Sequence, residues 1–196
     1  MEAIGIIGAG NIGKIVAAHL LKHNMPVIIS NSRGPETLKE TIEQLGSGAK
    51  AVNTAEAAEA DIVLLALPWS KVKDLAQITD LNGKIVIDAT NHFNPDYSVE
   101  DLGGKASSEV VQGYFPGSRI VKSFNTLVSK VLAADPVVGE GHRVLFVSGD
   151  DDQAKIEVSE IIKAIGFAPI DLGSLAVGSK YQQAKGTFSA LNLIKI

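Results

Sequence analysis

The chain has 196 residues, of which 45% are hydrophobic and 20% charged, a composition typical of a globular protein that can bury a full core. Its formal net charge of −4 provides no basic field, so composition gives no support to a nucleic-acid partner. The absence of cysteine excludes disulfides, thiolate nucleophiles and cysteine-ligated metals.

Short runs rich in Ile, Val, Leu and Ala alternate along the chain with segments of helical periodicity. This alternation predicts an α/β fold of the Rossmann type, a doubly wound, mostly parallel sheet of about eight strands in a single domain over residues 1–196. Most runs are continuously apolar, as expected for strands that are covered on both faces. The expected strands span residues 3–7, 26–30, 49–52, 61–67, 84–89, 119–124, 143–148 and 168–172.

Four helices are expected between these strands, over residues 11–23, 35–45, 54–60 and 151–165. Thr54 is the expected cap of the third helix, since its hydroxyl can accept from a free amide of the first turn. The spacing of the fourth helix predicts that four isoleucines face inward, namely Ile156, Ile161, Ile162 and Ile165.

The first expected strand runs into a glycine-rich turn that opens the first helix, with the sequence Gly8-Ala9-Gly10-Asn11-Ile12-Gly13. A G-x-G-x-x-G motif between a strand and a helix is the fingerprint of dinucleotide binding. Gly8 would permit the tight turn, Gly10 the close approach of backbone to pyrophosphate, and Gly13 the packing of helix on strand. The alternative is a glycine-rich turn without a ligand.

The second expected strand ends in Asn31-Ser32-Arg33, where an NAD-binding chain usually carries a carboxylate. Arg33 offers a planar fork of donors that suits a phosphate, and Ser32 adds a hydroxyl. The turn therefore predicts NADP rather than NAD, with a solvated turn arginine as the alternative.

Further polar and aromatic residues follow the later strands at the edge where open α/β sheets bind ligands. Trp69, after Leu67-Pro68, either stacks on the cofactor or packs on the next helix. His92 lies in the long loop 90–105 and is either an acid–base group or a solvated side chain.

The sixth expected strand leads into Asn125-Thr126-Leu127, where the nicotinamide should lie. Asn125 and Thr126 can orient a carboxamide or an electron acceptor, and Leu127 can form an apolar wall. The alternative is a structural cap between strand and helix. No catalytic triad, catalytic carboxylate pair or metal-ligand cluster can be assembled, so we expect no catalytic side chain and no metal, and the cofactor supplies the chemistry.

Together these stretches resemble the coenzyme F420-dependent NADP oxidoreductase family and its relative, the NADPH-binding domain of the STEAP ferric reductases. The matching stretches run in order along nearly the whole chain, at residues 6–13, 31–33, 67–69, 122–127, 149–152 and 172–175. The resemblance implies a domain that passes hydride between NADPH and a flavin-like ring. The cofactor-binding residues expected from motif and resemblance are Gly8, Ala9, Gly10, Asn11, Ile12, Gly13, Asn31, Ser32, Arg33, Leu67, Pro68, Trp69, Ala89, Asn91, Asn125, Thr126 and Leu127.

Two departures from the family pattern concern the acceptor. Some relatives carry a further basic residue shortly after the arginine, whereas here Lys39 is the first cation. The loop after the fifth strand reads Asn91-His92, where relatives often have Asn-Pro. The acceptor is therefore left open between the deazaflavin F420, FMN, FAD, a quinone and other small molecules.

The expected function is an NADPH-dependent oxidoreductase with a deazaflavin or flavin-like acceptor. The alternatives are a non-catalytic NADP sensor and a dehydrogenase of a small organic substrate. No apolar run reaches about 18 residues and the start of the chain has no basic region before a long apolar one, so we expect a cytoplasmic protein that makes no contact with a membrane. The alternating apolar residues of 189–196 need a surface to cover, either the chain's own core or a partner subunit, and we expect a homodimer.

Overall fold

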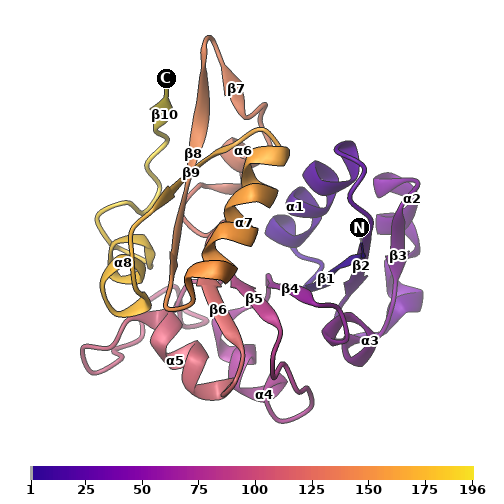
Figure 1. Ribbon diagram of the computed structural model, residues 1–196. Helices are drawn as coiled ribbons and strands as arrows, with labels where there is room; N and C mark the ends of the chain where they lie inside the picture. The colour runs from indigo at the N-terminus through magenta and orange to yellow at the C-terminus, as the bar shows by residue number, and fades with distance from the viewer. Residues whose placement is uncertain (1) are drawn as a thin grey trace.

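The computed structural model describes residues 2–196 and forms a ten-stranded, mostly parallel sheet with helices on both faces (Figure 1). The strand order is β10-β8-β6-β5-β4-β1-β2-β3, and β7 and β9 also pair with β8. The strands are β1 (Ile4–Ile7), β2 (Val27–Ser30), β3 (Ala49–Ala51), β4 (Ile62–Leu65), β5 (Ile85–Asp88), β6 (Arg119–Lys122), β7 (Val137–Val138), β8 (Gly141–Gly149), β9 (Ala168–Asp171) and β10 (Ile194–Lys195).

Eight α-helices and two short 3-10 helices connect the strands in residues 2–196. They are α1 (Asn11–Lys22), η1 (Pro35–Leu38), α2 (Lys39–Leu45), α3 (Thr54–Ala58), η2 (Trp69–Lys71), α4 (Val72–Leu75), α5 (Ser107–Tyr114), α6 (Ser129–Leu132), α7 (Asp152–Ala164) and α8 (Leu175–Gln182). None of the helices in this part of the chain is long and apolar enough to cross a membrane.

Neighbouring residues of each central strand point to opposite faces of the sheet, so each strand contributes to two cores. Ile6 packs with α1, α6 and α7, whereas Ile7 packs with α3, α4 and α5. Every residue of β1 and β5 is buried, which explains the continuous apolar runs of the sequence. The predicted Rossmann-type architecture is confirmed.

The strand order reverses between β1 and β4, which are parallel neighbours. From β1 the chain continues outward through β2 and β3, and from β4 it continues the other way through β5 and β6. Such a reversal leaves a crevice at the carboxyl ends of the two strands, where open α/β sheets bind their ligands. The glycine-rich turn lies at this point.

Three local predictions need correction. Residues 35–45 begin as 3-10 helix η1 before α2 starts at Lys39. The cap of α3 is Asn53 rather than Thr54, because Asn53 Oδ1 accepts the Glu56 amide at 2.9 Å while Glu56 Oε2 accepts the Asn53 amide at 3.1 Å.

Ile156 points to solvent and is 55% exposed, contrary to prediction. The buried face of α7 is defined by Ala154, Val158 and Ile161, and a residue two positions from Ala154 is rotated by about 200° around the helix. Ile161, Ile162 and Ile165 are buried as predicted.

Candidate functional site

The glycine-rich turn follows β1 directly, and its first and last glycines are required by close backbone packing. Gly8 has φ +117°, and a Cβ there would press on the Ala66 carbonyl oxygen after β4. A Cβ on Gly13 would press on the Gly8 carbonyl oxygen. Gly10 differs from both, because no atom lies within 4 Å of the position its Cβ would take. The open space at Gly10 fits a ligand that approaches the backbone closely.

Helix α1 begins immediately after this space without a side-chain cap. Gly10 is its N-cap with extended backbone, no side chain caps the first turn, and the first turn contains no acidic residue. Free amides and the positive end of the helix dipole therefore face the turn. This arrangement fits the pyrophosphate of a dinucleotide.

Gly8 and Gly10 predict opposite outcomes for the same substitution. Gly8→Ala forces a side chain into a strained backbone and against Ala66, so we expect a loss of about 2 kcal/mol or more in the free energy of unfolding. Gly10→Ala meets only open space, so we expect folding stability within about 1 kcal/mol of the wild type and NADPH binding weakened at least tenfold. Denaturant unfolding measures the stability effect and fluorescence titration the binding effect. Full NADPH affinity in Gly10→Ala would show that the pyrophosphate does not bind at this turn.

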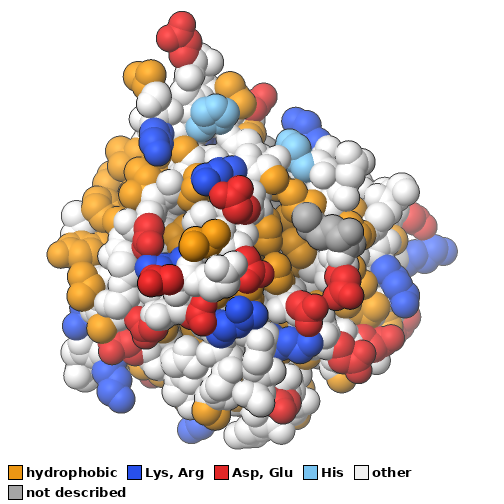
Figure 2. Space-filling model, in the orientation of Figure 1, with side chains coloured by type: hydrophobic (Ala, Val, Ile, Leu, Met, Phe, Trp, Pro, Cys, Tyr) orange, Lys and Arg blue, Asp and Glu red, His pale blue; other side chains and the backbone are white. Residues whose placement is uncertain are grey.

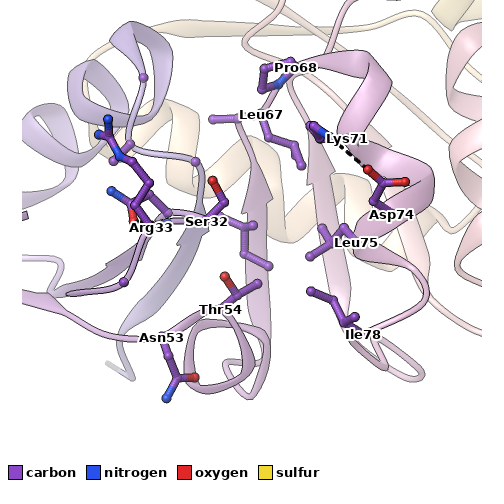
Figure 3. A pocket seen from close by; sticks show the side chains of 17 residues that line it. Ser32, Arg33, Asn53, Thr54, Leu67, Pro68, Lys71, Asp74, Leu75 and Ile78 are labelled. Atoms are coloured by element: carbon purple, nitrogen blue, oxygen red, sulfur yellow. Dashed lines mark hydrogen bonds and ion pairs between the residues drawn. The ribbon is translucent and has the colours of Figure 1, made fainter. Parts of the chain in front are cut away.

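A cavity of about 720 Å³ opens at the carboxyl ends of β1, β2 and β4 (Figure 3). It brings together eight predicted site residues, namely Gly8, Ala9, Gly10, Asn31, Ser32, Arg33, Leu67 and Pro68. The other predicted residues do not line it, and these are Asn11, Ile12, Gly13, Trp69, Ala89, Asn91, Asn125, Thr126 and Leu127. The cavity can therefore hold the adenosine and pyrophosphate half of a dinucleotide.

The turn after β2 forms one wall of the cavity, and Asn31 shapes it. Asn31 Oδ1 accepts the Arg33 amide at 2.9 Å, and Asn31 Nδ2 donates to Thr37 Oγ1 at 2.9 Å. Asn31 therefore organises the turn with its side chain, while Ser32 and Arg33 are exposed. Among residues 2–196, no carboxylate forms a salt bridge with Arg33. Its guanidinium is available to an anionic ligand.

The opposite wall contains residues that sequence reasoning missed. In Figure 3, Leu75 and Ile78 point into the cavity from the α4 side, facing Ser32 and Arg33 across it. Lys71 lines the same side and donates to Asp74 at 3.1 Å. The apolar wall formed by Leu75 and Ile78 suits a flat face of an adenine ring.

Asn53 and Thr54 close the cavity from the end of β3. The rule that ligands bind at the carboxyl ends of the strands would have pointed to these two residues, because β3 ends just before them. No sequence rule pointed to Leu75 and Ile78 as cavity residues, because α4 has only four residues and Ile78 follows it in a turn.

Trp69 lies outside the cavity and packs in the interior. Its indole Nε1 donates to Glu100 Oε2 at 2.5 Å, and its ring meets the His92 ring edge-on at a centroid distance of 6.1 Å. These contacts are with the 90–105 loop, which neither of the two predicted roles of Trp69 named, and stacking on the cofactor stays a prediction. Burial, and next the charge of Lys122, lowers the pKa of His92 and favours its neutral form.

Asn91 and Asn125 meet at the carboxyl ends of β5 and β6. Asn125 Nδ2 donates to Asn91 Oδ1 at 3.0 Å, and Asn91 Nδ2 donates to the Asn125 carbonyl at 3.0 Å. Thr126 offers its carbonyl to the Ala190 amide at 2.8 Å, and Leu127 is buried. This second group of predicted residues lies one and two strands beyond the cavity, on the side expected for the nicotinamide.

Beneath this group lies a fully buried ion pair that the sequence analysis did not foresee. Lys122 Nζ lies 3.1 Å from Asp88 Oδ2 and also donates to the Thr90 carbonyl. Asp88 further accepts from Ser108 Oγ at 2.6 Å and from Thr90 Oγ1 at 2.6 Å. Burial alone would raise the pKa of Asp88, but Lys122, Ser108 and Thr90 outweigh it and hold that pKa below its ordinary value. The pair ties the ends of β5 and β6 together.

The glycine turn at the reversal of strand order, the uncapped helix and the open arginine turn define a Rossmann-type dinucleotide-binding protein. Residues 3–92 match the family described as NADP oxidoreductase, coenzyme F420-dependent. Over 177 residues, 88% of its length, the chain is 31% identical to metalloreductase STEAP3 of Rattus norvegicus, of which the match covers 34%. These matches agree with the resemblance stated from the sequence, and the chain spans about a third of the length of the curated relatives it matches.

Solved structures agree with this assignment. A hypothetical protein from Sinorhizobium meliloti is 44% identical with a TM-score of 0.94, and the match covers 100% of this chain and 97% of that one. A protein of Arthrobacter sp. FB24 named as an F420-dependent NADP-reductase is 25% identical with a TM-score of 0.74, covering 87% of this chain and 84% of that one. The reductive aminase of Aspergillus terreus, solved with NADPH, shares the fold at 19% identity and a TM-score of 0.64, over 89% of this chain and 55% of that one. The name of the Arthrobacter protein agrees with the predicted enzyme class and cofactor, and the reductive aminase shows the shared fold.

Proposed function

We propose that this protein is an NADPH-dependent oxidoreductase that transfers hydride between NADP(H) and a flavin-like acceptor, either a deazaflavin such as F420 or FMN or FAD. The observation that carries the proposal is the cavity that joins the open space at Gly10 to the unpaired guanidinium of Arg33. It supplies a pyrophosphate position and a 2′-phosphate position within one continuous space.

Each part of the chain has a distinct task in this proposal. The first turn of α1 binds pyrophosphate, Ser32 and Arg33 bind the 2′-phosphate, and Leu75 with Ile78 holds the adenine face. When bound, NADPH supplies the hydride. Hydride transfer between two stacked rings requires mainly a reacting distance of about 3–3.5 Å and aligned faces, so the protein's contribution is position.

No side chain is assigned as a general acid. His92 is the nearest candidate, but it is buried, and burial lowers the pKa of its imidazole and so disfavours the protonated form that a general acid needs. Asn125 and Leu127 are proposed to face the ring pair from the end of β6. The acceptor is thus selected by the shape and hydrogen bonds of that end.

An acceptor panel tests this proposal. NADPH and NADH are offered separately with F420, FMN, FAD and a soluble quinone, and the loss of the reduced nicotinamide absorbance is followed. We expect acceptor-dependent oxidation of NADPH that exceeds that of NADH at least tenfold. Tight binding of NADPH without turnover on any acceptor would favour the non-catalytic sensor, and turnover only with a small carbonyl or imine would favour the dehydrogenase.

We also propose that a second copy of the chain covers the apolar surface around β10. Figure 2 shows hydrophobic side chains gathered along the left edge, over α8 and the segment that leads to β10. Tyr181, Leu191 and Leu193 are exposed there, and β10 has β8 as its single neighbour. The Ala190–Thr126 hydrogen bond joins this surface to the turn after β6, where we propose that the nicotinamide end binds, so a dimer would also close the site.

Deletion of Leu193–Ile196 tests the dimer. We expect the mass measured by light scattering to fall from twice the chain mass to the chain mass of 20.6 kDa. Ile156→Lys, which changes an exposed isoleucine on α7, serves as the matched control and should leave the mass unchanged. An equal mass for the wild type and the deletion variant would retire the dimer proposal.

A further inference from the structure

A second cavity lies at the edge of the sheet where the strands begin, opposite the edge that carries the nucleotide cavity of Figure 3. Its volume is about 720 Å³, equal to that of the nucleotide cavity, and the two share no lining residue among residues 2–196. Strands β1, β4, β5 and β6 each contribute their first residue, namely Ile4, Ile62, Ile85 and Arg119. Ile4 precedes Gly8 by four residues, about 13 Å along an extended chain, so this amino-edge groove is a separate site.

One wall of the amino-edge groove is a single stripe along helix α7. The lining residues of α7 recur at i, i+3, i+4, i+7, i+8 and i+11, which is the spacing of one helix face. They are Gln153, Ile156, Glu157, Glu160, Ile161 and Ala164. Ile156 therefore lines the groove, which accounts for an isoleucine that is 55% exposed on a helix whose other isoleucines are buried.

The floor of the groove is apolar sheet between two helices. On this face of the sheet, α1 packs on β1 and β2, whereas α7 packs on β6, β8 and β9. The first residues of β4 and β5 lie between the two helices, and the buried side chains of Ile4, Met25 and Ile85 line the groove from below. In Figure 2, hydrophobic side chains are visible in a hollow beside α7, in the middle of the face. Sites for small organic ligands are largely apolar and occupy about 300–1,000 Å³, so the groove has the size and the floor of such a site.

The rim of the groove is acidic. The carboxylates of Glu2, Asp61, Glu157 and Glu160 line it, whereas Arg119 is the one cationic residue of the lining in the described residues 2–196. Arg119 Nη1 lies 3.9 Å from Glu157 Oε1, a long distance for an ion pair. Carboxylates beside an apolar wall concentrate negative potential in a cleft, because little water screens them from that side. The lining therefore favours a ligand that carries positive charge.

Two lysines outside the groove pair with rim carboxylates without using them up. Lys84 Nζ lies 3.2 Å from Asp61 Oδ1, and Lys163 Nζ lies 2.7 Å from Glu160 Oε1. Neither lysine lines the groove, and the side chains of Asp61 and Glu160 are 74% and 64% exposed. Exposed pairs of this kind are weak, and an ionised carboxylate accepts several hydrogen bonds at once. Both carboxylates can therefore accept a further donor from a ligand in the groove.

We propose that the amino-edge groove binds a small organic amine, whose apolar body packs between Ile85 and Ile156 while its ammonium group meets Glu157 and Glu160 of α7. The class of ligand follows from the two halves of the lining, since the apolar floor takes a hydrocarbon body from water and the carboxylates select a cation. The inference goes beyond the proposed NADP(H) function and does not depend on it. Because the nucleotide cavity lies at the other ends of β1 and β4, the amine and NADPH bind at the same time.

Methyl NMR on isoleucine-labelled protein tests the site and the ligand class together. Ile4, Ile85 and Ile156 report on the groove, and Ile7 and Ile78 report on the nucleotide cavity. The probes are 4-phenylbutylamine, 4-phenylbutan-1-ol and 4-phenylbutanoate, which share one apolar body and differ in charge, and each is titrated in the presence of saturating NADPH. We expect the amine to shift the groove methyls and to bind at least about tenfold more tightly than the alcohol or the carboxylate.

Several outcomes of this titration overturn the inference. Equal affinity for the amine and the alcohol removes charge from the recognition, and tighter binding of the carboxylate assigns the groove to an anion at Arg119. Shifts confined to Ile7 and Ile78 place the amine in the nucleotide cavity, and no binding leaves the groove to a macromolecular partner. The titration is repeated without NADPH, so that a failure to bind NADPH refutes the proposed function alone and the amine result still judges the groove.

Two carboxylate substitutions on α7 test the proposed contact with the ammonium group. Glu157→Gln combined with Glu160→Gln should weaken amine binding about tenfold and leave the alcohol unchanged, which brings the two affinities together. Glu40→Gln combined with Glu43→Gln is the matched control, because these glutamates have the same spacing, are exposed on α2 and do not line the groove. The control should weaken amine binding by less than about threefold. An equal loss in both double variants would reduce the effect to net charge and overturn the contact.

A steric variant tests the location independently of charge. Ala164 is exposed at the end of α7 and lines the groove, so Ala164→Trp should fill it and weaken amine binding at least about tenfold. Ala133→Trp, at an exposed alanine that follows α6, is the matched control and should leave binding unchanged. Thermal unfolding checks that both variants fold. Full amine affinity in folded Ala164→Trp overturns the inference, and the carboxylate variants decide it where Ala164→Trp does not fold.

Discussion

Lys122→Met should lower the free energy of unfolding by about 3–5 kcal/mol, the largest stability effect that we expect from a single side chain here. Lys122 and Asp88 are both fully buried and lie 3.1 Å apart. Removal of the cation leaves a carboxylate in the core with hydroxyl and amide partners only. Denaturant unfolding, followed by circular dichroism at pH 7, measures the loss.

Two further variants make this test specific. Lys163→Met breaks an exposed pair with Glu160 and should change stability by less than about 1 kcal/mol. Addition of Asp88→Asn to Lys122→Met should recover part of the loss, because no unpaired charge remains buried while Ser108 and Thr90 keep a polar partner. A Lys122→Met variant as stable as Lys163→Met would show that the buried pair makes no net contribution.

The parts of the fold that could be predicted are those in which one local signal decides the structure. Buried parallel strands are continuously apolar, and β1, β4 and β5 therefore appeared with errors of one or two residues at their ends. Helices α4 and α6 have four residues each, too few for a period of 3.6 to show. Ile156 does not share the buried face of Ile161, Ile162 and Ile165, because its angular position on α7 is turned toward solvent.

The candidate site divides in the same way. The glycine turn and Arg33 could be predicted because their spacing reflects backbone geometry within a single βαβ unit. The Lys122–Asp88 pair joins residues that are 34 positions apart, and the sequence around either residue does not indicate that it has a buried partner. The direction of the Trp69 indole could not be predicted from its neighbours in the sequence. It depends on a hydrogen bond with Glu100, which lies 31 positions away along the chain.

Arg33→Ala should weaken NADPH binding by about 10- to 100-fold and leave NADH binding nearly unchanged. A hydrogen bond to a charged group contributes about 1.5–3 kcal/mol, and each 1.4 kcal/mol corresponds to a factor of ten in affinity. Arg33 lines the cavity and has no carboxylate partner in the salt bridges of residues 2–196, so its loss removes donors from the ligand alone. Fluorescence titration with both nucleotides measures the effect.

Lys39→Ala is the matched control, since it removes an exposed cation on the following helix that does not line the cavity. It should shift both affinities by less than about threefold, which separates a direct contact from a general change in field strength. Ser32→Asp should go further than Arg33→Ala and reverse the preference, because a carboxylate there repels a 2′-phosphate and accepts from a 2′-hydroxyl. Equal losses of NADPH and NADH affinity in Arg33→Ala would instead place the guanidinium against a group that both nucleotides share, such as the adenine ring. The 2′-phosphate would then need another cation. Within the described residues 2–196, Lys71 on the opposite wall is the other cationic residue that lines the cavity.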